Sequence, residues 1–143
     1  MNRITLNNKI QMPMLGFGTF LMGGSECEES VRAAIRSGYR MIDTAEAYRN
    51  EEAVGSAIVK SGIPREELFL VTKVNFRSYE NTRETVEASL NKLKTSYLDL
   101  VLLHWTFGNY YAAWRELEKM YHEGKIRAIG VSNFDPGRLI DLI

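Results

Sequence analysis

The sequence of 143 residues predicts an α/β fold with a parallel sheet of the (β/α)8 TIM-barrel type. Short apolar runs alternate with segments of helical periodicity, which is typical of βα units that build a parallel sheet. Four of the runs end in polar residues, namely Asp43, Lys73, His104 and the pair Ser132–Asn133. Because the carboxyl ends of parallel strands meet at one edge of a sheet, we expect these side chains to share one space.

The N-terminal residues predict a β-hairpin and then a short strand. Runs 3–6 and 9–12 flank Asn7–Asn8, and asparagine tolerates the positive φ angles of a tight turn. The glycine-containing run 15–20 is expected to form the first strand of the parallel sheet.

Two helices with start and stop signals are predicted next. Ser25 and Glu28 have the spacing of a capping box, and the helix that they open is expected to end near Gly38. Asn50 is expected to cap the second helix, because acidic residues follow it in the first turn. Gly62 is expected to end that helix.

The rest of the chain repeats the same unit. Apolar residues recur at helical spacing over about 79–93 and about 110–123. Asp135–Pro136 predicts the start of a last helix, with proline at its first position. The apolar runs expected as the other strands are 40–43, 68–73, 98–104 and 126–131.

Two architectures are compatible with this alternation, a doubly wound open sheet and a barrel. A doubly wound dinucleotide fold requires Gly-x-Gly-x-x-Gly after its first strand, and Leu21 stands where the run Gly16–Gly18 would require the third glycine, so the barrel is favoured. About five βα units of the eight are present, and residues 1–143 are interpreted as a single domain, truncated at the C-terminus. Its edges at 15–20 and 126–131 would stay unpaired, which predicts self-association.

Composition narrows the class of protein. The chain has 18 basic and 18 acidic residues, so its charge indicates neither a nucleic-acid partner nor a membrane surface. No apolar run approaches the roughly 18 residues of a membrane span. Cys27 is the only cysteine, which excludes an internal disulfide and is typical of a cytoplasmic protein.

Tyr48 follows Asp43 at the entry of the next helix, where it can share a pocket with Lys73 and His104. A phenol has a pKa near ~10 and is a poor acid at neutral pH, but a nearby ammonium group favours the phenolate and makes the proton easier to donate. Asp43 is expected to pair with Lys73, and His104 to hydrogen-bond a substrate carbonyl. This combination predicts chemistry in which a C=O group is protonated on oxygen while hydride arrives at carbon.

Six segments carry a resemblance to one known family. They are Leu15–Thr19, Gly38–Ala45, Tyr48 with Asn50–Glu51, Thr72–Lys73, Leu103–Trp105 and Gly124–Phe134. Each motif alone is weak, but together they lie in order and cover nearly the whole chain. The chain resembles the N-terminal half, or slightly more, of an aldo-keto reductase.

The resemblance implies an NADPH-dependent oxidoreductase acting on CH–OH groups, with an aldehyde or ketone as the substrate, NADH as the alternative cofactor and no metal. It implies a catalytic tetrad with Tyr48 as the general acid, formed by Asp43, Tyr48, Lys73 and His104. The cofactor-binding residues that it implies are Thr19, Asp43, Ser132 and Asn133. The substrate-binding residues that it implies are Phe20, Trp105 and His104.

Three alternatives stand beside the reductase. A non-enzymatic cofactor-binding subunit on the same scaffold would not need Tyr48 and Lys73 together. A metal-dependent barrel hydrolase would need clustered His and acidic ligands, and the chain has only 2 histidines. The family's main contacts to the cofactor's pyrophosphate and 2′-phosphate follow its last two strands, so the 143 residues alone are expected to be an inactive fragment that binds NADPH weakly.

The family often has proline after His104–Trp105, and Thr106–Gly108 here predicts a different loop.

Overall fold

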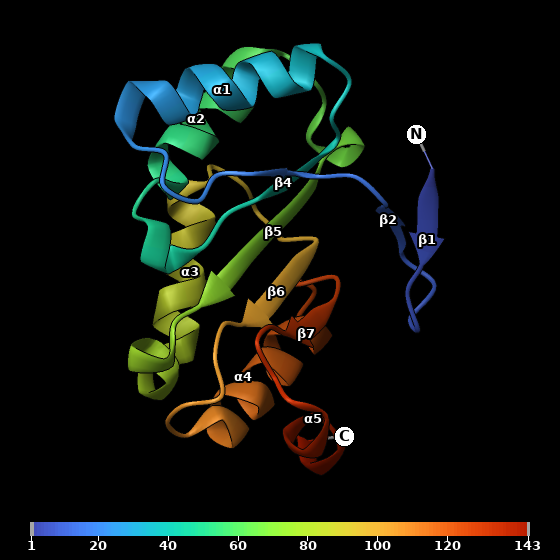
Figure 1. The fold of residues 1–143 in the computed structure, drawn as a ribbon, viewed down its shortest axis with the longest axis vertical. Helices are drawn as coiled ribbons and strands as arrows, with labels where there is room; N and C mark the ends of the chain where they lie inside the picture. Colours follow the sequence, from blue (N-terminus) through green and yellow to red (C-terminus); the bar gives the residue numbers. More distant parts are fainter. Residues whose placement is uncertain (1, 143) are drawn as a thin grey trace.

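Within residues 2–142, which the computed structural model describes, the apolar runs form a five-stranded parallel sheet (Figure 1). The strands pair in chain order, as the sequence predicts for a barrel of βα units. They are shorter than the apolar runs that contain them, and their bounds are β3 Phe17–Gly18, β4 Met41–Asp43, β5 Phe69–Val74, β6 Leu100–Leu103 and β7 Ile129–Val131. The first and last of them, β3 and β7, are the edges of the sheet.

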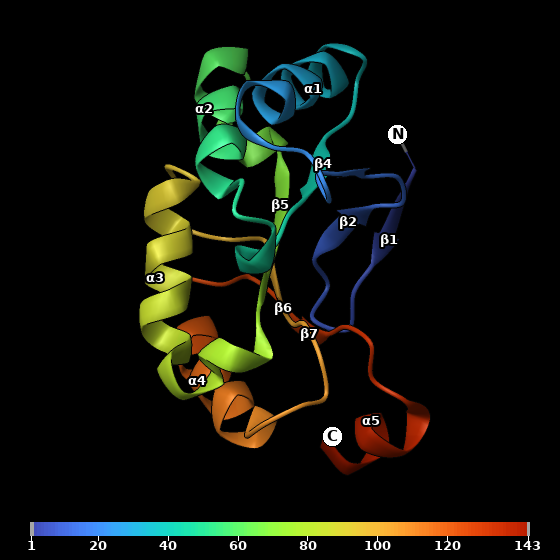
Figure 2. The ribbon, with the colours of Figure 1, turned by 60° about the vertical axis from the view of Figure 1, so that its left-hand side comes forward.

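The helices alternate with the strands, and α1 to α4 cover one face of the sheet, whereas α5 lies away from that face (Figure 2). Their bounds are α1 Gly24–Arg36, α2 Glu51–Ser61, α3 Thr82–Lys92, α4 Tyr110–His122 and α5 Pro136–Leu142. Three 3-10 turns lie between them, η1 Glu46–Tyr48, η2 Arg65–Glu67 and η3 Phe76–Asn81. None of the helices in residues 2–142 is long and apolar enough to cross a membrane.

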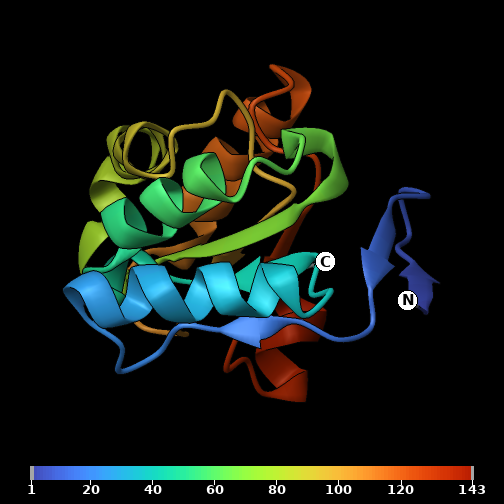
Figure 3. The same cartoon turned by 90° about the horizontal axis from the view of Figure 1, so that it is seen from above.

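The predicted hairpin is present and stands apart from the helices (Figure 3). Strands β1 (Arg3–Thr5) and β2 (Gln11–Pro13) pair antiparallel. The positive φ angle of the turn, 69°, falls on Lys9 and not on the asparagines. The Asn8 side-chain amide instead donates to the carbonyl oxygen of Arg127, 2.8 Å away and before β7, so the hairpin lies at the amino ends of the strands.

The two faces of the sheet differ in burial. Residues that face the helices, such as Ile42, Leu70 and Val101, form one core with the apolar sides of α1 to α4. The sequence predicted strands buried on both sides, and this holds for β5, but on the other face Leu100 and Leu102 of β6 are only half-buried. The reason is that five strands do not close around this face, which is the interior in a complete barrel.

The start of α1 corrects one expectation. The helix begins at Gly24 with Gly23 as its N-cap, and no side chain caps it, so the capping box at Ser25 is not formed. The carboxylate of Glu28 instead accepts a hydrogen bond of 2.6 Å from the Lys60 ammonium of α2. A contact between two helices has replaced a local cap.

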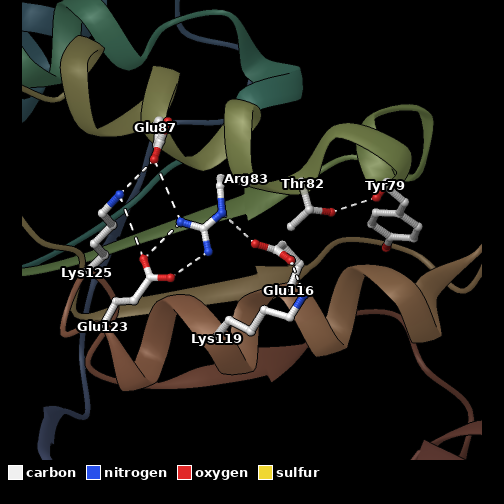
Figure 4. Close-up of polar contacts among 8 residues, drawn as sticks. All are labelled: Tyr79, Thr82, Arg83, Glu87, Glu116, Lys119, Glu123 and Lys125. Atoms are coloured by element: carbon white, nitrogen blue, oxygen red, sulfur yellow. Dashed lines mark hydrogen bonds and ion pairs between the residues drawn. The ribbon is translucent and has the colours of Figure 1, made fainter.

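An ion-pair network joins the outer surfaces of α3 and α4 (Figure 4). The Arg83 guanidinium lies 2.6 Å from the carboxylate of Glu116 and 2.7 Å from that of Glu123. Beside it, the Lys125 ammonium lies 2.7 Å from the carboxylate of Glu87. Exposed pairs contribute little singly, so the network aligns two helices that the apolar core already holds together.

Helices α2 and α3 approach closely at Gly55. A Cβ atom there would lie 2.2 Å from the carbonyl oxygen of Lys92 and 2.9 Å from the Cα of Leu93. Both contacts are with backbone, which cannot move aside without shifting a helix. Glycine is therefore required in mid-helix, in spite of its poor helix propensity.

We expect Gly55→Ala to lower the free energy of unfolding by about 1–3 kcal/mol, because the overpacking outweighs the gain of up to ~1 kcal/mol in helix propensity. Urea unfolding followed by circular dichroism measures the change. Val59→Ala in the same helix is the control, since this side chain is 60% exposed. A Gly55→Ala protein as stable as the parent would contradict the close approach.

Candidate active site

The first two polar strand ends meet in a partly buried ion pair. The Lys73 ammonium donates to the Asp43 carboxylate at 2.5 Å and to the carbonyl oxygen of Thr44 at 2.8 Å. The Lys73 side chain is 8% exposed, so its charge needs these partners. Asp43 ends β4 and Lys73 is the last residue but one of β5, and pairing of these strands brings the two groups together.

Tyr48 comes to the same place from η1. Its hydroxyl lies 3.5 Å from the Lys73 ammonium, which also stands 5.1 Å from the centre of its ring. The turn ends at Arg49, which has a φ angle of 57° and so reverses the chain before α2. The ring of Tyr48 also contacts the rings of Phe20 at 5.0 Å and His104 at 5.8 Å between centroids.

His104 follows β6 and faces Tyr48 from the other side. Its backbone N–H donates to the carbonyl oxygen of Val74 at 3.0 Å. The Nδ1 atom of its ring is buried and has no hydrogen-bond partner in residues 2–142. Burial lowers the pKa of His104, the Lys73 charge lowers it further, and Asp43 and Glu46 oppose this. A neutral imidazole with one N–H to donate is therefore favoured at neutral pH.

Ser132 and Asn133 lie beside His104 at the end of β7. The Asn133 side-chain amide donates to the carbonyl oxygen of His104 at 2.9 Å and to the Ser132 hydroxyl at 3.0 Å. Asn133 has a φ angle of 58°, a left-handed conformation that asparagine tolerates well. The polar residues at the ends of the four apolar runs therefore all lie at the carboxyl end of the sheet.

The other residues predicted to bind the cofactor or the substrate differ in their exposure to solvent. Trp105 is 39% exposed and stacks on His104 at 5.8 Å, and Phe20 is 62% exposed beside Tyr48. Thr19 is fully buried, and its hydroxyl donates to the carbonyl oxygen of Asp43 at 3.2 Å. Thr19 therefore supports the strand end that carries Asp43 and does not present its hydroxyl to a ligand.

The loop after His104 extends an aromatic surface away from Tyr48. The Phe107 ring is stacked beside that of Trp105 at 6.3 Å and meets the Phe76 ring edge-on at 5.3 Å. Phe107 is 56% exposed, and Gly108 turns the chain after it with a φ angle of 69°. This loop lacks proline, as the sequence showed, and instead presents an apolar aromatic side chain.

Asn50 has a role that the sequence did not reveal. It occupies the N-cap position of α2, as expected, but its side chain does not cap the helix. Its amide nitrogen donates to the carbonyl oxygens of Thr19 at 2.8 Å and Met22 at 2.9 Å, and its amide oxygen accepts from the Thr44 hydroxyl at 2.8 Å. Asn50 therefore joins the loops that follow β3 and β4. An asparagine before acidic residues is equally typical of a simple cap, so no local signal predicted this.

Two glutamates hold the loops around Lys73 in a similar way. The Glu46 carboxylate accepts from the backbone N–H of Asn75 at 3.0 Å and from the Ser78 hydroxyl at 2.6 Å. The buried Glu51 accepts from the hydroxyl of Thr72, next to Lys73, at 2.7 Å. These contacts connect η1 and α2 to the end of β5, and their partners are too distant in the sequence to be paired by pattern.

Known proteins share this chain's sequence pattern and its fold. A model of the aldo/keto reductase family matches residues 14–142. A protein of Bacillus subtilis named glyoxal reductase is 50% identical over 98% of this chain and 52% of its own length. A crystal structure of an aldo/keto reductase from Brucella melitensis superposes with a TM-score of 0.96 at 41% identity, covering 99% of this chain and 57% of that one.

An aldo-keto reductase of Bombyx mori, solved in complex with NADP, gives a TM-score of 0.92 at 31% identity, over 99% of this chain and 53% of that one. The chain spans about half the length of the curated relatives that it matches. The five strands therefore correspond to part of the eight-stranded barrel, as the sequence predicted.

We expect an NMR titration to show the pKa of His104 below its ordinary value of about 6.5, and Lys73→Met to raise it, because one of the two causes of the shift is removed. The unfolded chain binds this proton more tightly than the folded one, so the free energy of unfolding should fall as the pH drops below about 6.5.

The exposed His122 at the end of α4 is the internal reference, and Lys73→Met should leave its titration curve unchanged. His104→Gln assigns the resonance of His104. If Lys73→Met leaves the titration curve of His104 unchanged as well, the electrostatic coupling between Lys73 and His104 is contradicted.

Proposed function

The chain belongs to the aldo/keto reductase family, and on that premise we propose that it carries the proton-transfer centre of an NADPH-dependent reductase of aldehydes or ketones. One observation carries the proposal. The Lys73 ammonium lies between the carboxylate of Asp43 and the hydroxyl of Tyr48, and His104 faces the same phenol ring. An acid, its activating charge and a hydrogen-bond donor for a carbonyl thus share one end of the sheet.

Tyr48 is the proposed general acid. As a carbonyl becomes an alcohol, negative charge develops on its oxygen, and the phenol proton neutralises it. The charge that remains on the phenol oxygen is stabilised by the ammonium of Lys73, 3.5 Å away. Asp43 orients this ammonium group through their ion pair. Asp43 therefore acts on Lys73, and Lys73 in turn acts on Tyr48.

His104 is proposed to orient the carbonyl. Its neutral form is favoured, so its ring has one N–H to donate to a carbonyl oxygen without competing with Tyr48 as an acid. A cationic imidazole beside Lys73 would place two positive charges together in a buried site. The lowered pKa of His104 therefore suits a donor better than it suits a second acid.

The residues at the end of β7 suit a nicotinamide. The Asn133 amide nitrogen is used within the protein, so Ser132 and Asn133 offer a hydroxyl donor and an amide oxygen acceptor beside His104, which suit the acceptor and donor of a carboxamide. When bound, the reduced nicotinamide supplies hydride to the carbonyl carbon. We propose NADPH as the cofactor, with support from the Bombyx mori relative, which was solved with NADP.

The substrate is proposed to be a small aldehyde or ketone. The exposed aromatic side chains Phe20, Trp105 and Phe107 form an apolar surface next to the polar groups of the site. Such a surface suits the carbon part of a substrate, while Tyr48 and His104 bind its oxygen. The relative named glyoxal reductase makes glyoxal the natural first substrate to assay.

We expect Tyr48→Phe to lower kcat for glyoxal reduction by at least about 100-fold, because it removes the proton donor and keeps the ring. NADPH oxidation is followed by absorbance in the full-length natural protein that contains these residues. NADPH affinity, measured by fluorescence, should change little.

Tyr121→Phe is the matched control, since Tyr121 lies on α4 away from the four site residues. Its kcat should equal that of the parent. A Tyr48→Phe protein with full activity would reject Tyr48 as the acid. A parent protein that binds NADPH but turns over no carbonyl compound would instead support the non-enzymatic subunit.

A further inference from the structure

The peptide bond between His104 and Trp105 is held from two sides. Its carbonyl oxygen accepts from the Asn133 amide at 2.9 Å, and its N–H donates to the hydroxyl of Tyr79 at 3.2 Å. The same Tyr79 hydroxyl donates to the carbonyl oxygen of Trp105 at 2.5 Å. One hydroxyl therefore binds both peptide groups that flank Trp105, which restricts the two backbone dihedral angles of that residue.

The Tyr79 side chain is itself well anchored. Tyr79 is 3% exposed and belongs to η3, in the loop that follows Lys73, and its carbonyl oxygen accepts from the Thr82 hydroxyl at 2.8 Å (Figure 4). Burial raises the pKa of the Tyr79 phenol, so the hydroxyl keeps the proton that it donates to Trp105. Tyr79 thus links the β5–α3 connection to the loop after β6.

The ring of His104 lacks an anchor of its own. Its buried Nδ1 atom has no hydrogen-bond partner in the part of the chain that the structure describes. What orients the ring is therefore its backbone and its contacts with two aromatic rings, Tyr48 at 5.8 Å and Trp105 at 5.8 Å. The backbone on the C-terminal side of His104, and the Trp105 ring, both depend on the peptide groups that Tyr79 holds.

We propose that Tyr79 is a positioning residue for the reaction, whose hydroxyl holds the His104–Trp105 segment so that the imidazole faces Tyr48. The proposal rests on the proposed reductase function, in which His104 orients the carbonyl. Tyr79 itself does not touch the substrate or the cofactor. Its hydroxyl acts through two backbone groups and so sets the geometry of a side chain that does.

Tyr79→Phe tests the proposal, because it removes only the hydroxyl. In the full-length natural protein we expect kcat for glyoxal to fall about 10- to 100-fold, since small misplacements of a catalytic group have effects of this size. NADPH affinity should stay within about twofold of the parent. In NMR spectra, the imidazole C–H resonances of His104 should move, because their shifts reflect the rings of Tyr48 and Trp105.

Tyr110→Phe is the matched control. Tyr110 is also a buried tyrosine of this region, but within residues 2–142 its hydroxyl bonds only to that of Tyr111, at 3.4 Å. It should change neither kcat nor the His104 resonances. Unchanged His104 resonances and unchanged kcat in Tyr79→Phe would overturn the proposal. If the parent reduces no carbonyl compound, the reductase function fails, whereas the NMR shift still decides whether Tyr79 positions His104.

If Tyr79→Phe does not fold, hydrogen exchange in the parent protein tests the proposal. The N–H of Trp105 lies outside the strands, yet the hydrogen bond to Tyr79 should make its exchange with deuterium as slow as that of the strand residue Leu103. Exchange as fast as at the exposed Gly108 would overturn the proposal.

Discussion

The buried ammonium group of Lys73 determines how the strand ends of the site must be arranged. A charge that is removed from water must be compensated, and here Asp43 and the carbonyl oxygen of Thr44 do so. The compensation depends on strand register: Asp43 pairs with Val71, so Lys73 lies two residues further along on the same face of the sheet. A slip of one residue would turn Lys73 towards the helices and leave both charges without a partner.

Each adjacent pair of loops at the carboxyl end of the sheet is joined by at least one polar side chain. Asn50 joins the loops after β3 and β4, Glu46 those after β4 and β5, and two further residues continue the series, Tyr79 and Asn133. All of these contacts lie within the protein, so they form whether or not a ligand is bound. The arrangement of the Tyr48 hydroxyl, the Lys73 ammonium group and the His104 imidazole is thereby organised before any ligand binds.

Much of this could be predicted from the sequence, for identifiable reasons. The order of strands and the meeting of Asp43, Lys73 and His104 follow from local apolar patterns and from parallel topology, which places strand ends together. The capping box at Ser25 was wrong, because Glu28 found an ion-pair partner in the neighbouring helix. The partners of Asn50, the burial of Thr19 and the Tyr79 contacts join loops that are far apart in the chain, and no local pattern encodes such pairs.

Lys73 is proposed to act on the reaction through Tyr48, and a double-mutant cycle distinguishes this role from an independent one. The values of kcat for glyoxal reduction are measured in the parent, in Lys73→Met, in Tyr48→Phe and in the protein with both changes. If Lys73 serves only to stabilise charge on the Tyr48 oxygen, the double variant has the kcat of Tyr48→Phe within about twofold. If the two losses multiply, Lys73 acts independently of Tyr48, and its proposed role is wrong.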